Sequence, residues 1–423
     1  MDRRQYLGHF IILFTGTAAA QVLNLASYPF LARLYSPADF GVFATFVAAS
    51  AIPGAVACGR FDLAVPTAPS AGRFAILWLC VLFATLMGAL AALGGAIYWW
   101  GVEGVSDPVR PLLLGLCVFF TGFCAAGALF LMRHDWYRVN SASLLARTGA
   151  VVALQIGLAF VAPSPLSLIV GFTAGFAVQA LIFAWTIWRH IEPGPPRPRQ
   201  MRAMFRRYKR QVAVDIPSTF VAAVSYNLLT FMLAGHYGQV AVGLYALGAR
   251  IAIMPLQLFN DSLGQVFFQK AAAAERERGH FWPEMKFNLT VSGLISLGAL
   301  FGLWLLAHPF IRLYLGAEWE PAADMLVVLA PMLAARSLAM SIATTVFVMR
   351  KAHWLLAHNV ANAVAHGIAF AAALILGLGV MSFLVVAAAL LTIEYLLFAL
   401  FLALKAYGGT KRLRFDGRPE IGA

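Results

Sequence analysis

A chain of 423 residues that is 61% hydrophobic and only 12% charged does not have the composition of a soluble protein, in which about a quarter of the residues are charged. Its mean hydropathy is +0.79, and apolar runs of about 20 residues follow one another, which excludes a string of soluble domains and indicates a polytopic membrane protein. The net charge of +13 would suggest nucleic-acid binding in a soluble protein, but in a membrane protein the loop charge reports orientation.

The apolar runs predict an all-α membrane protein, because a helix satisfies its own backbone hydrogen bonds in lipid. Each run is long enough to cross about 30 Å of hydrocarbon as a helix. We therefore expect about twelve membrane helices. In chain order they are residues 10–34, 41–66, 74–100, 109–132, 142–162, 166–188, 211–234, 241–268, 287–314, 323–349, 354–377 and 382–404.

The basic residues predict the orientation of these spans. With the N-terminus in the cytoplasm, 25 of the 31 Lys and Arg residues fall on the cytoplasmic side, and only Arg33, Arg110 and Arg312 fall on the opposite side. This bias favours an even number of spans with both termini in the cytoplasm. Because the basic residues mark one face of a membrane, they also argue against nucleic acid as a partner.

The longest predicted cytoplasmic loop separates two halves of the chain. It begins with a Pro-rich stretch, residues 192–199, that is not expected to be helical. In the basic sequence that follows, Met201, Met204, Phe205 and Tyr208 lie at the spacing of an amphipathic helix. Such a helix is either a linker on anionic lipid or a site that recruits a ligand. The predicted organisation is residues 1–188 (N-terminal lobe), 189–210 (linker), 211–405 (C-terminal lobe) and 406–423 (cytoplasmic tail).

The two halves repeat each other at an offset of 202 residues. Spans one and seven both begin on the cytoplasmic side, so the repeat predicts two six-helix lobes related by a parallel pseudo-two-fold axis. Repeats of this kind build transporters with a site between the halves, although duplication for packing alone would leave the same pattern. The identical pairs are Leu31 and Leu233, Ala32 and Ala234, Tyr35 and Tyr237, Gly41 and Gly243, Ala44 and Ala246, and Pro53 and Pro255. The two prolines are predicted to lie mid-span, as bending points.

Five segments carry a resemblance to a known family. They are LARLYSPADFGVFA from Leu31, GRFDLAVPTAP from Gly59, GLYALGARIAIMP from Gly243, QVFFQKAAA from Gln265 and LYLGAEWEPAADMLVVLAP from Leu313. The first two fit the ARxYxPxxFG and GRFxLA patterns of the polysaccharide flippase family. The chain resembles this family of lipid-linked oligosaccharide (O-antigen-type) translocases, within the multidrug/oligosaccharidyl-lipid/polysaccharide superfamily, over essentially its whole length.

The resemblance implies a function and a location. It implies flipping of an undecaprenyl-diphosphate-linked oligosaccharide across the bacterial inner membrane, for O-antigen or exopolysaccharide assembly, by alternating access through a cationic central cavity. A polysaccharide polymerase and assembly proteins would then be partners, beside membrane lipids. We expect no enzyme activity and no cofactor, because the sequence has neither a phosphate-binding P-loop motif nor a loop large enough for a glycosyltransferase domain.

Charged residues inside predicted spans are the best candidates for a site, because each is costly in hydrocarbon. Arg60, Arg250 and Arg336 stay protonated and must therefore contact water, an acid or an anionic ligand. An Arg offers paired N–H donors to phosphate oxygens, so these three are the substrate-binding candidates. The alternative for each is a structural pair with an acid of a neighbouring helix.

Acidic and polar residues inside the spans form a second group of candidates. Glu394, His366 and Asp62 are candidates for coupling to a proton or a sodium ion. Asp62 follows Arg60 by two residues, so on a helix the two side chains would point apart and would not pair. Asn24 and Asn227 are candidates for contact with sugar. Hydrogen bonding between helices accounts for the asparagines equally well.

No metal site is predicted, because the four cysteines lie in apolar runs without a C-x-x-C pair and are expected to be small core residues. Two other functions stay open. A multidrug or small-metabolite exporter of the same superfamily would have an acidic cavity and would not depend on the arginines. A non-transporting scaffold of a polysaccharide assembly complex would have no aqueous cavity.

Overall fold

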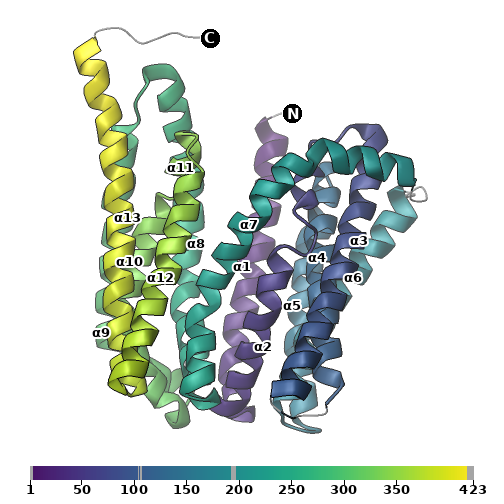
Figure 1. Ribbon diagram of the computed structural model, residues 1–423, viewed down its shortest axis with the longest axis vertical. Coiled ribbons are helices and arrows are strands. Elements are labelled where there is room, and N and C mark those ends of the chain that lie inside the picture. The colour runs from purple at the N-terminus through teal and green to yellow at the C-terminus, as the bar shows by residue number, and fades with distance from the viewer. Residues whose placement is uncertain (1–2, 103, 105–106, 192–196, 417–423) are drawn as a thin grey trace. The chain divides into compact units, whose positions relative to one another are not determined.

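The structure is a computed structural model that describes residues 3–102, 104, 107–191 and 197–416. Every regular element in these residues is a helix (Figure 1). The chain forms two compact units, Met1–Phe231 and Met232–Ala423. The predicted all-helical fold class is confirmed.

Unit 1 contains the first six long helices and most of the seventh. Two 3-10 turns follow the second helix, and a π-helical turn extends the third. The elements are α1 (Arg3–Leu34), α2 (Pro37–Ala55), η1 (Phe61–Ala64), η2 (Ser70–Gly72), α3 (Arg73–Ala96), η3 (Ile97–Val102), α4 (Val109–Arg133), α5 (Tyr137–Ala159), α6 (Pro165–Ile191) and α7 (Pro198–His236).

Unit 2 begins at the end of α7 and holds five further long helices. The elements are α8 (Gln239–Arg278), α9 (Trp282–Tyr314), η4 (Ala317–Trp319), α10 (Glu320–Ser341), α11 (Thr345–Val348), α12 (His353–Leu376) and α13 (Val380–Asp416). The first part of the segment predicted as a tail is therefore helical.

The long helices have the length and composition of membrane spans. Within the described residues, 11 helical stretches are long and apolar enough to cross a bilayer, and α1, with 32 residues, is long enough to be the twelfth. On α3, more than half of the surface of Leu82, Leu86, Leu90 and Leu93 is exposed. These residues recur every turn or two of the helix, so they form an apolar stripe that suits contact with lipid. The protein is a multi-pass membrane protein.

A tyrosine hydroxyl ties the first corner of each half to a carbonyl oxygen further along the chain. In the first half, Ser36 and Asp39 form a reciprocal capping box at the start of α2, and Pro37 occupies the first turn. The Tyr35 hydroxyl donates to the carbonyl oxygen of Gln155 near the end of α5, over 2.6 Å. In the second half, the Tyr237 hydroxyl donates over 2.9 Å to the carbonyl oxygen of Leu378, just after α12.

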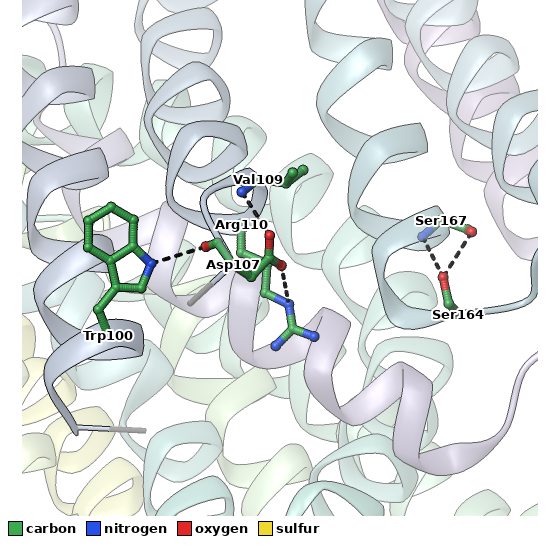
Figure 2. Close-up of polar contacts among 6 residues, drawn as sticks. All are labelled: Trp100, Asp107, Val109, Arg110, Ser164 and Ser167. Carbon is green, nitrogen blue, oxygen red and sulfur yellow. Dashed lines mark hydrogen bonds and ion pairs between the residues drawn. The ribbon is translucent and has the colours of Figure 1, made fainter. Parts of the chain in front are cut away.

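Figure 2 shows two further corners of unit 1. At the start of α4, the Asp107 carboxylate accepts from the Val109 N–H over 2.9 Å and pairs with Arg110 Nε over 3.3 Å. The Trp100 indole donates to the Asp107 carbonyl oxygen, and its ring is half exposed, as in an interfacial aromatic belt. At the start of α6, the Ser164 hydroxyl accepts from the Ser167 N–H.

Two predicted spans end earlier than expected. The span predicted over residues 41–66 ends as a helix at Ala55, and Pro53 therefore lies in its last turn rather than mid-span. Gly59 and Arg60 both have left-handed backbone angles, φ 56° and 58°, which a right-handed helix cannot contain. The tenth span ends at Ser341, before the short α11. Pro255, by contrast, lies inside α8.

Helix α7 joins two segments that the sequence treats separately. The amphipathic stretch and the seventh span form one helix of 39 residues, with Pro217 inside it and the membrane-spanning part beginning at Asp215. Residues 192–196 of the Pro-rich stretch lie outside the described residues. Met204, Tyr208 and Ile216 pack against the buried core of unit 1, in which Val212 is itself buried. The apolar face of this stretch is thus covered by protein instead of lipid.

Candidate functional site

The first group of candidates lies in the break after α2. Arg60 Nη1 approaches Asp62 Oδ2 to 3.8 Å, and the two side chains are 24% and 10% exposed. The prediction that these residues would not pair is wrong, because Arg60 is not helical: its φ of 58° turns the backbone so that both side chains lie on one side. The pair is long, and Arg60 Nε is buried with no hydrogen-bond partner in the described part of the chain.

The surroundings of this break raise the pKa of the Asp62 carboxyl. Burial raises the pKa of the Asp62 carboxyl above its usual value, the nearby Arg60 charge opposes this shift, and the negative charge of Asp215 adds to it. Asp62 lies outside the membrane-spanning stretches, between Ala55 and Arg73. This acid can therefore take up a proton more readily than an exposed aspartate.

Basic residues hold the same break in place. Arg133, at the end of α4, donates through Nη1 to the Val65 carbonyl oxygen over 2.6 Å. Arg73 Nη1 lies 3.2 Å from His134 Nε2. A backbone that leaves the helical pattern needs donors for its carbonyl groups, so Arg133 has a structural role here, whereas Arg73 contacts a histidine ring.

The second group of candidates lies between α12 and α13. Glu394 on α13 receives two contacts from α12: His358 Nδ1 lies 2.6 Å from Oε1, and the Asn362 amide donates to Oε2 over 3.2 Å. One turn further along α12, His366 Nδ1 lies 2.9 Å from the Asn362 carbonyl oxygen. The His358 ring also stacks on Phe398, with centroids 4.1 Å apart. Glu394 thus has a built polar environment within one unit.

Sequence reasoning found Glu394 and His366 but missed His358 and Asn362. These three α12 residues stand four apart, which places them on one face of the helix, and all three are buried. That spacing was a usable signal. On α10, Arg336 is half buried, and its charge acts on His366 together with that of Glu394. The structure therefore brings three predicted residues near one another: Arg336, His366 and Glu394.

The remaining predicted residues are Arg250, Asn227 and Asn24. Arg250 is exposed on α8, and it forms no ion pair with any described residue. The Asn227 amide donates to the Ala223 carbonyl oxygen of its own helix over 2.8 Å, so it makes a local bond. Asn24 is half buried on α1, where its carbonyl oxygen accepts from the Ser27 hydroxyl.

One further arginine lies deep in a span. Arg147 was expected beside a cytoplasmic loop, but α5 begins at Tyr137, so Arg147 stands about 15 Å along the helix. Its Nη1 donates to Gln179 Oε1 over 3.1 Å, and its guanidinium lies 4.6 Å from the centroid of the Phe176 ring. The Gln179 amide in turn donates to the Ser143 hydroxyl. This cation therefore has neutral polar and aromatic neighbours on α5 and α6.

Among the described residues, no three His, Cys, Asp or Glu side chains come together in a way that could hold a metal ion. The four cysteines are buried, in agreement with their prediction as core residues.

A family model described as "Polysaccharide biosynthesis protein" matches residues 73–324, more than half of the chain. The chain belongs to this family. No curated protein matches it. The matched range includes Arg250 but ends before Arg336 and the Glu394 cluster.

Solved structures share the fold at low sequence identity. An inward-facing multidrug resistance MATE family transporter of the MOP superfamily is 14% identical, with a TM-score of 0.72 over 93% of this chain and 96% of that one. The lipid II flippase MurJ in an inward closed conformation is 13% identical, with a TM-score of 0.73 over 97% and 94%. A MOP superfamily transporter from Pyrococcus furiosus is 13% identical, with a TM-score of 0.62 over 95% of each chain. The protein therefore has the fold of MOP superfamily transporters.

Proposed function

We propose that the protein translocates an undecaprenyl-diphosphate-linked oligosaccharide from the cytoplasmic to the outer leaflet of the inner membrane, for assembly of a surface polysaccharide such as O-antigen or exopolysaccharide. Membership of a polysaccharide biosynthesis family supports the pathway. The likeness of its fold to a lipid II flippase supports a lipid-linked cargo. The excess of basic residues on one side supports cytoplasmic termini.

The observation that carries the proposal is the state of Arg250. It stands on a membrane-spanning helix, is exposed, and has no ion pair among the described residues. A guanidinium in that position needs water or an anionic ligand. A diphosphate supplies oxygens that match the paired N–H donors of an arginine, whereas a cationic drug would be repelled.

In this proposal the candidates have distinct roles. Arg250 and Arg336 bind the diphosphate, with Arg60 as a third cation near the end of α2. Asn24 and Asn227 offer amides to the sugar. The lipid tail stays in the bilayer while access to the head group alternates, as in transporters built from parallel repeats. The cluster of Glu394, His358, Asn362 and His366 couples transport to a proton or a sodium ion, and Asp62 is a second coupling candidate.

The test is leaflet-resolved accumulation of lipid-linked glycan in cells. We expect Arg250→Ala and Arg336→Ala to retain glycan in the cytoplasmic leaflet, and Arg250→Lys to restore part of the delivery because it keeps the charge without the paired donors. Arg312→Ala is the matched control, since Arg312 is exposed on α9 on the side predicted to be outside. Normal delivery in both alanine variants at normal protein levels would rule out the assigned diphosphate ligands.

A multidrug or small-metabolite exporter is the second candidate, favoured by the likeness to the MATE family transporter. It makes the opposite prediction for the same variants. Efflux of a cationic dye should survive Arg250→Ala and Arg336→Ala, and glycan delivery should be independent of the protein. The two functions are therefore separated by one set of strains.

A further inference from the structure

The first three turns of α7 present a dense basic surface. Seven exposed cations occur between residues 197 and 210, and the sequence contains no Asp or Glu from 193 to 214. None of them forms an ion pair with the described residues. We call this set the basic surface. Its members are Arg197, Arg199, Arg202, Arg206, Arg207, Lys209 and Arg210.

The opposite face of the same stretch is fastened to unit 1. Met204 packs so closely on Gly72 that a Cβ at Gly72 would lie 2.6 Å from the Met204 sulfur. Phe205 stacks on Phe83 with centroids 6.5 Å apart and lies 5.6 Å from the ring of Phe61. The stretch therefore does not depend on lipid to cover its apolar face. Contacts with unit 1 therefore fix the position of the cations of the basic surface.

Exposed tryptophans at the end of α6 indicate where unit 1 meets the membrane–water interface. Trp185 and Trp188, near the end of α6, are 59% and 77% exposed, and the Arg189 guanidinium lies 5.6 Å from the centroid of the Trp185 ring. Exposed Trp beside Arg at a helix end is typical of the membrane–water interface. Seven residue steps separate Ile191 from Pro198, which limits their distance to about 25 Å.

The buried core of unit 1 includes residues from both the end of α6, which carries the tryptophans, and α7, which carries the basic surface. Ile187 of α6 and Val212 of α7 belong to the same buried cluster, so the end of α6 and the part of α7 just after the basic surface share one core. In Figure 1, α7 begins as a segment that runs across the ends of the unit 1 helices and then turns along them. The ends of helices long enough to span a membrane are where lipid head groups would lie.

We propose that the basic surface binds the head groups of acidic phospholipids in the adjoining leaflet. Anionic lipids attract cations placed near a membrane surface, and the attraction fades within a Debye length. Seven cations between residues 197 and 210, with no acid from residue 193 to 214, give charge complementarity to a layer of phosphate groups. The exposed tryptophans favour a bilayer over a soluble acidic protein. The structure adds that protein contacts, not insertion of the apolar face, fix the helix there.

The test uses the full-length protein in phosphatidylcholine bilayers with spin-labelled lipids. The relative association constant of labelled phosphatidylglycerol over labelled phosphatidylcholine is measured by electron paramagnetic resonance. We expect the wild type to prefer phosphatidylglycerol by at least about fivefold, the effect of one cation near an anionic surface, and to lose the preference at high salt.

Three variants isolate the basic surface. R202Q/R206Q/R207Q/R210Q should lose most of the preference, while R202K/R206K/R207K/R210K should keep it. The matched control K270Q/R276Q/K286Q/K351Q removes four exposed cations of unit 2 and should also keep it. Of the four arginines removed, Arg207 makes a ring contact, with Tyr208, and circular dichroism checks that each variant stays folded.

Several outcomes would overturn the proposal. The wild type could show no preference, the glutamine variant could keep it, or the unit 2 control could lose as much. Displacement of labelled phosphatidylglycerol by inorganic diphosphate, beyond the effect of chloride at equal ionic strength, would assign the surface to the diphosphate of a substrate instead. The first three results leave the proposed transport function untouched, because none of them measures glycan delivery.

Discussion

The hydroxyl of Tyr35 donates to the carbonyl oxygen of Gln155, 120 residues further along the chain. The bond ties the corner after α1 to the end of α5. Tyr237, at the matching position of the second half, makes the corresponding bond to Leu378 just after α12. Tyr35 and Tyr237, which are identical residues at matching positions of the sequence repeat, therefore make equivalent hydrogen bonds. This argues that the repeat reflects a repeated structure and not similar composition alone.

We expect Tyr35→Phe and Tyr237→Phe each to lower the free energy of unfolding by about 1 kcal/mol, the usual net value of one such hydrogen bond. The two sites belong to different units, so the double variant should lose the sum of the two effects. Thermal unfolding of the purified protein in detergent measures both. A loss confined to Tyr35 would mean that only the first corner depends on its tyrosine.

Gly59 should tolerate no side chain. Its φ is 56°, and a Cβ would lie 2.9 Å from Phe83 Cδ1, so Gly59→Ala should cost more than about 1 kcal/mol. Gly293, inside α9, has no atom within 4 Å of its Cβ position, and there alanine should stabilise by about 0.5–1 kcal/mol. Unfolding of the two variants side by side measures the contrast. Equal effects at both positions would contradict the left-handed turn.

The break after α2 should make stability depend on pH. Because the pKa of Asp62 is raised above 3.8 in the folded protein, its favourable contribution is complete below about pH 4 and is lost as the pH rises through the folded-state pKa. Asp62→Asn removes this dependence. The melting temperature of the variant should therefore improve relative to wild type between about pH 4 and pH 7. Parallel pH profiles for the two proteins would show that Asp62 titrates as an ordinary aspartate.

The Glu394 cluster should show strong pairwise coupling. His358→Phe leaves the Glu394 carboxylate without its histidine, and Glu394→Leu leaves both His358 and Asn362 without their acceptor. The His358 and Glu394 side chains are 4% and 12% exposed, so each substitution should cost about 3 kcal/mol. The double variant should cost at least about 1 kcal/mol less than the sum, since no unpaired charge then remains. The free energies of unfolding of the wild type, the two single variants and the double variant complete this double-mutant cycle. Additive costs would place His358 and Glu394 in separate environments.

Composition and periodicity were sufficient to predict the helices and the two halves. Apolar length alone decides that a segment spans a membrane, and the paired tyrosines marked the corners. The depth of Arg147 was not predictable in the same way. Helix α5 starts at Tyr137 rather than at residue 142, and its polar residues Ser141 and Ser143 are buried. An average of hydropathy over such polar residues predicts a loop where the structure has a helix.

The break after α2 was hidden for a different reason. The sequence marks only Gly59 as suited to a left-handed angle, whereas Arg60 adopts one as well. Tertiary contacts hold it there, among them the bond from Arg133 to Val65, and these are invisible in a linear pattern. The pair of Arg60 and Asp62 follows from that turn, so a helical reading of the segment had to miss it.

The four native cysteines offer a practical benefit. All of them are buried and all lie before residue 125, so the second half of the chain contains no thiol. A water-soluble maleimide should therefore label the folded protein only where a new cysteine is introduced. Asp135→Cys and Ala162→Cys would place such labels in exposed corners at opposite ends of α5, and the orientation of the protein can be mapped in intact cells without first removing any native residue.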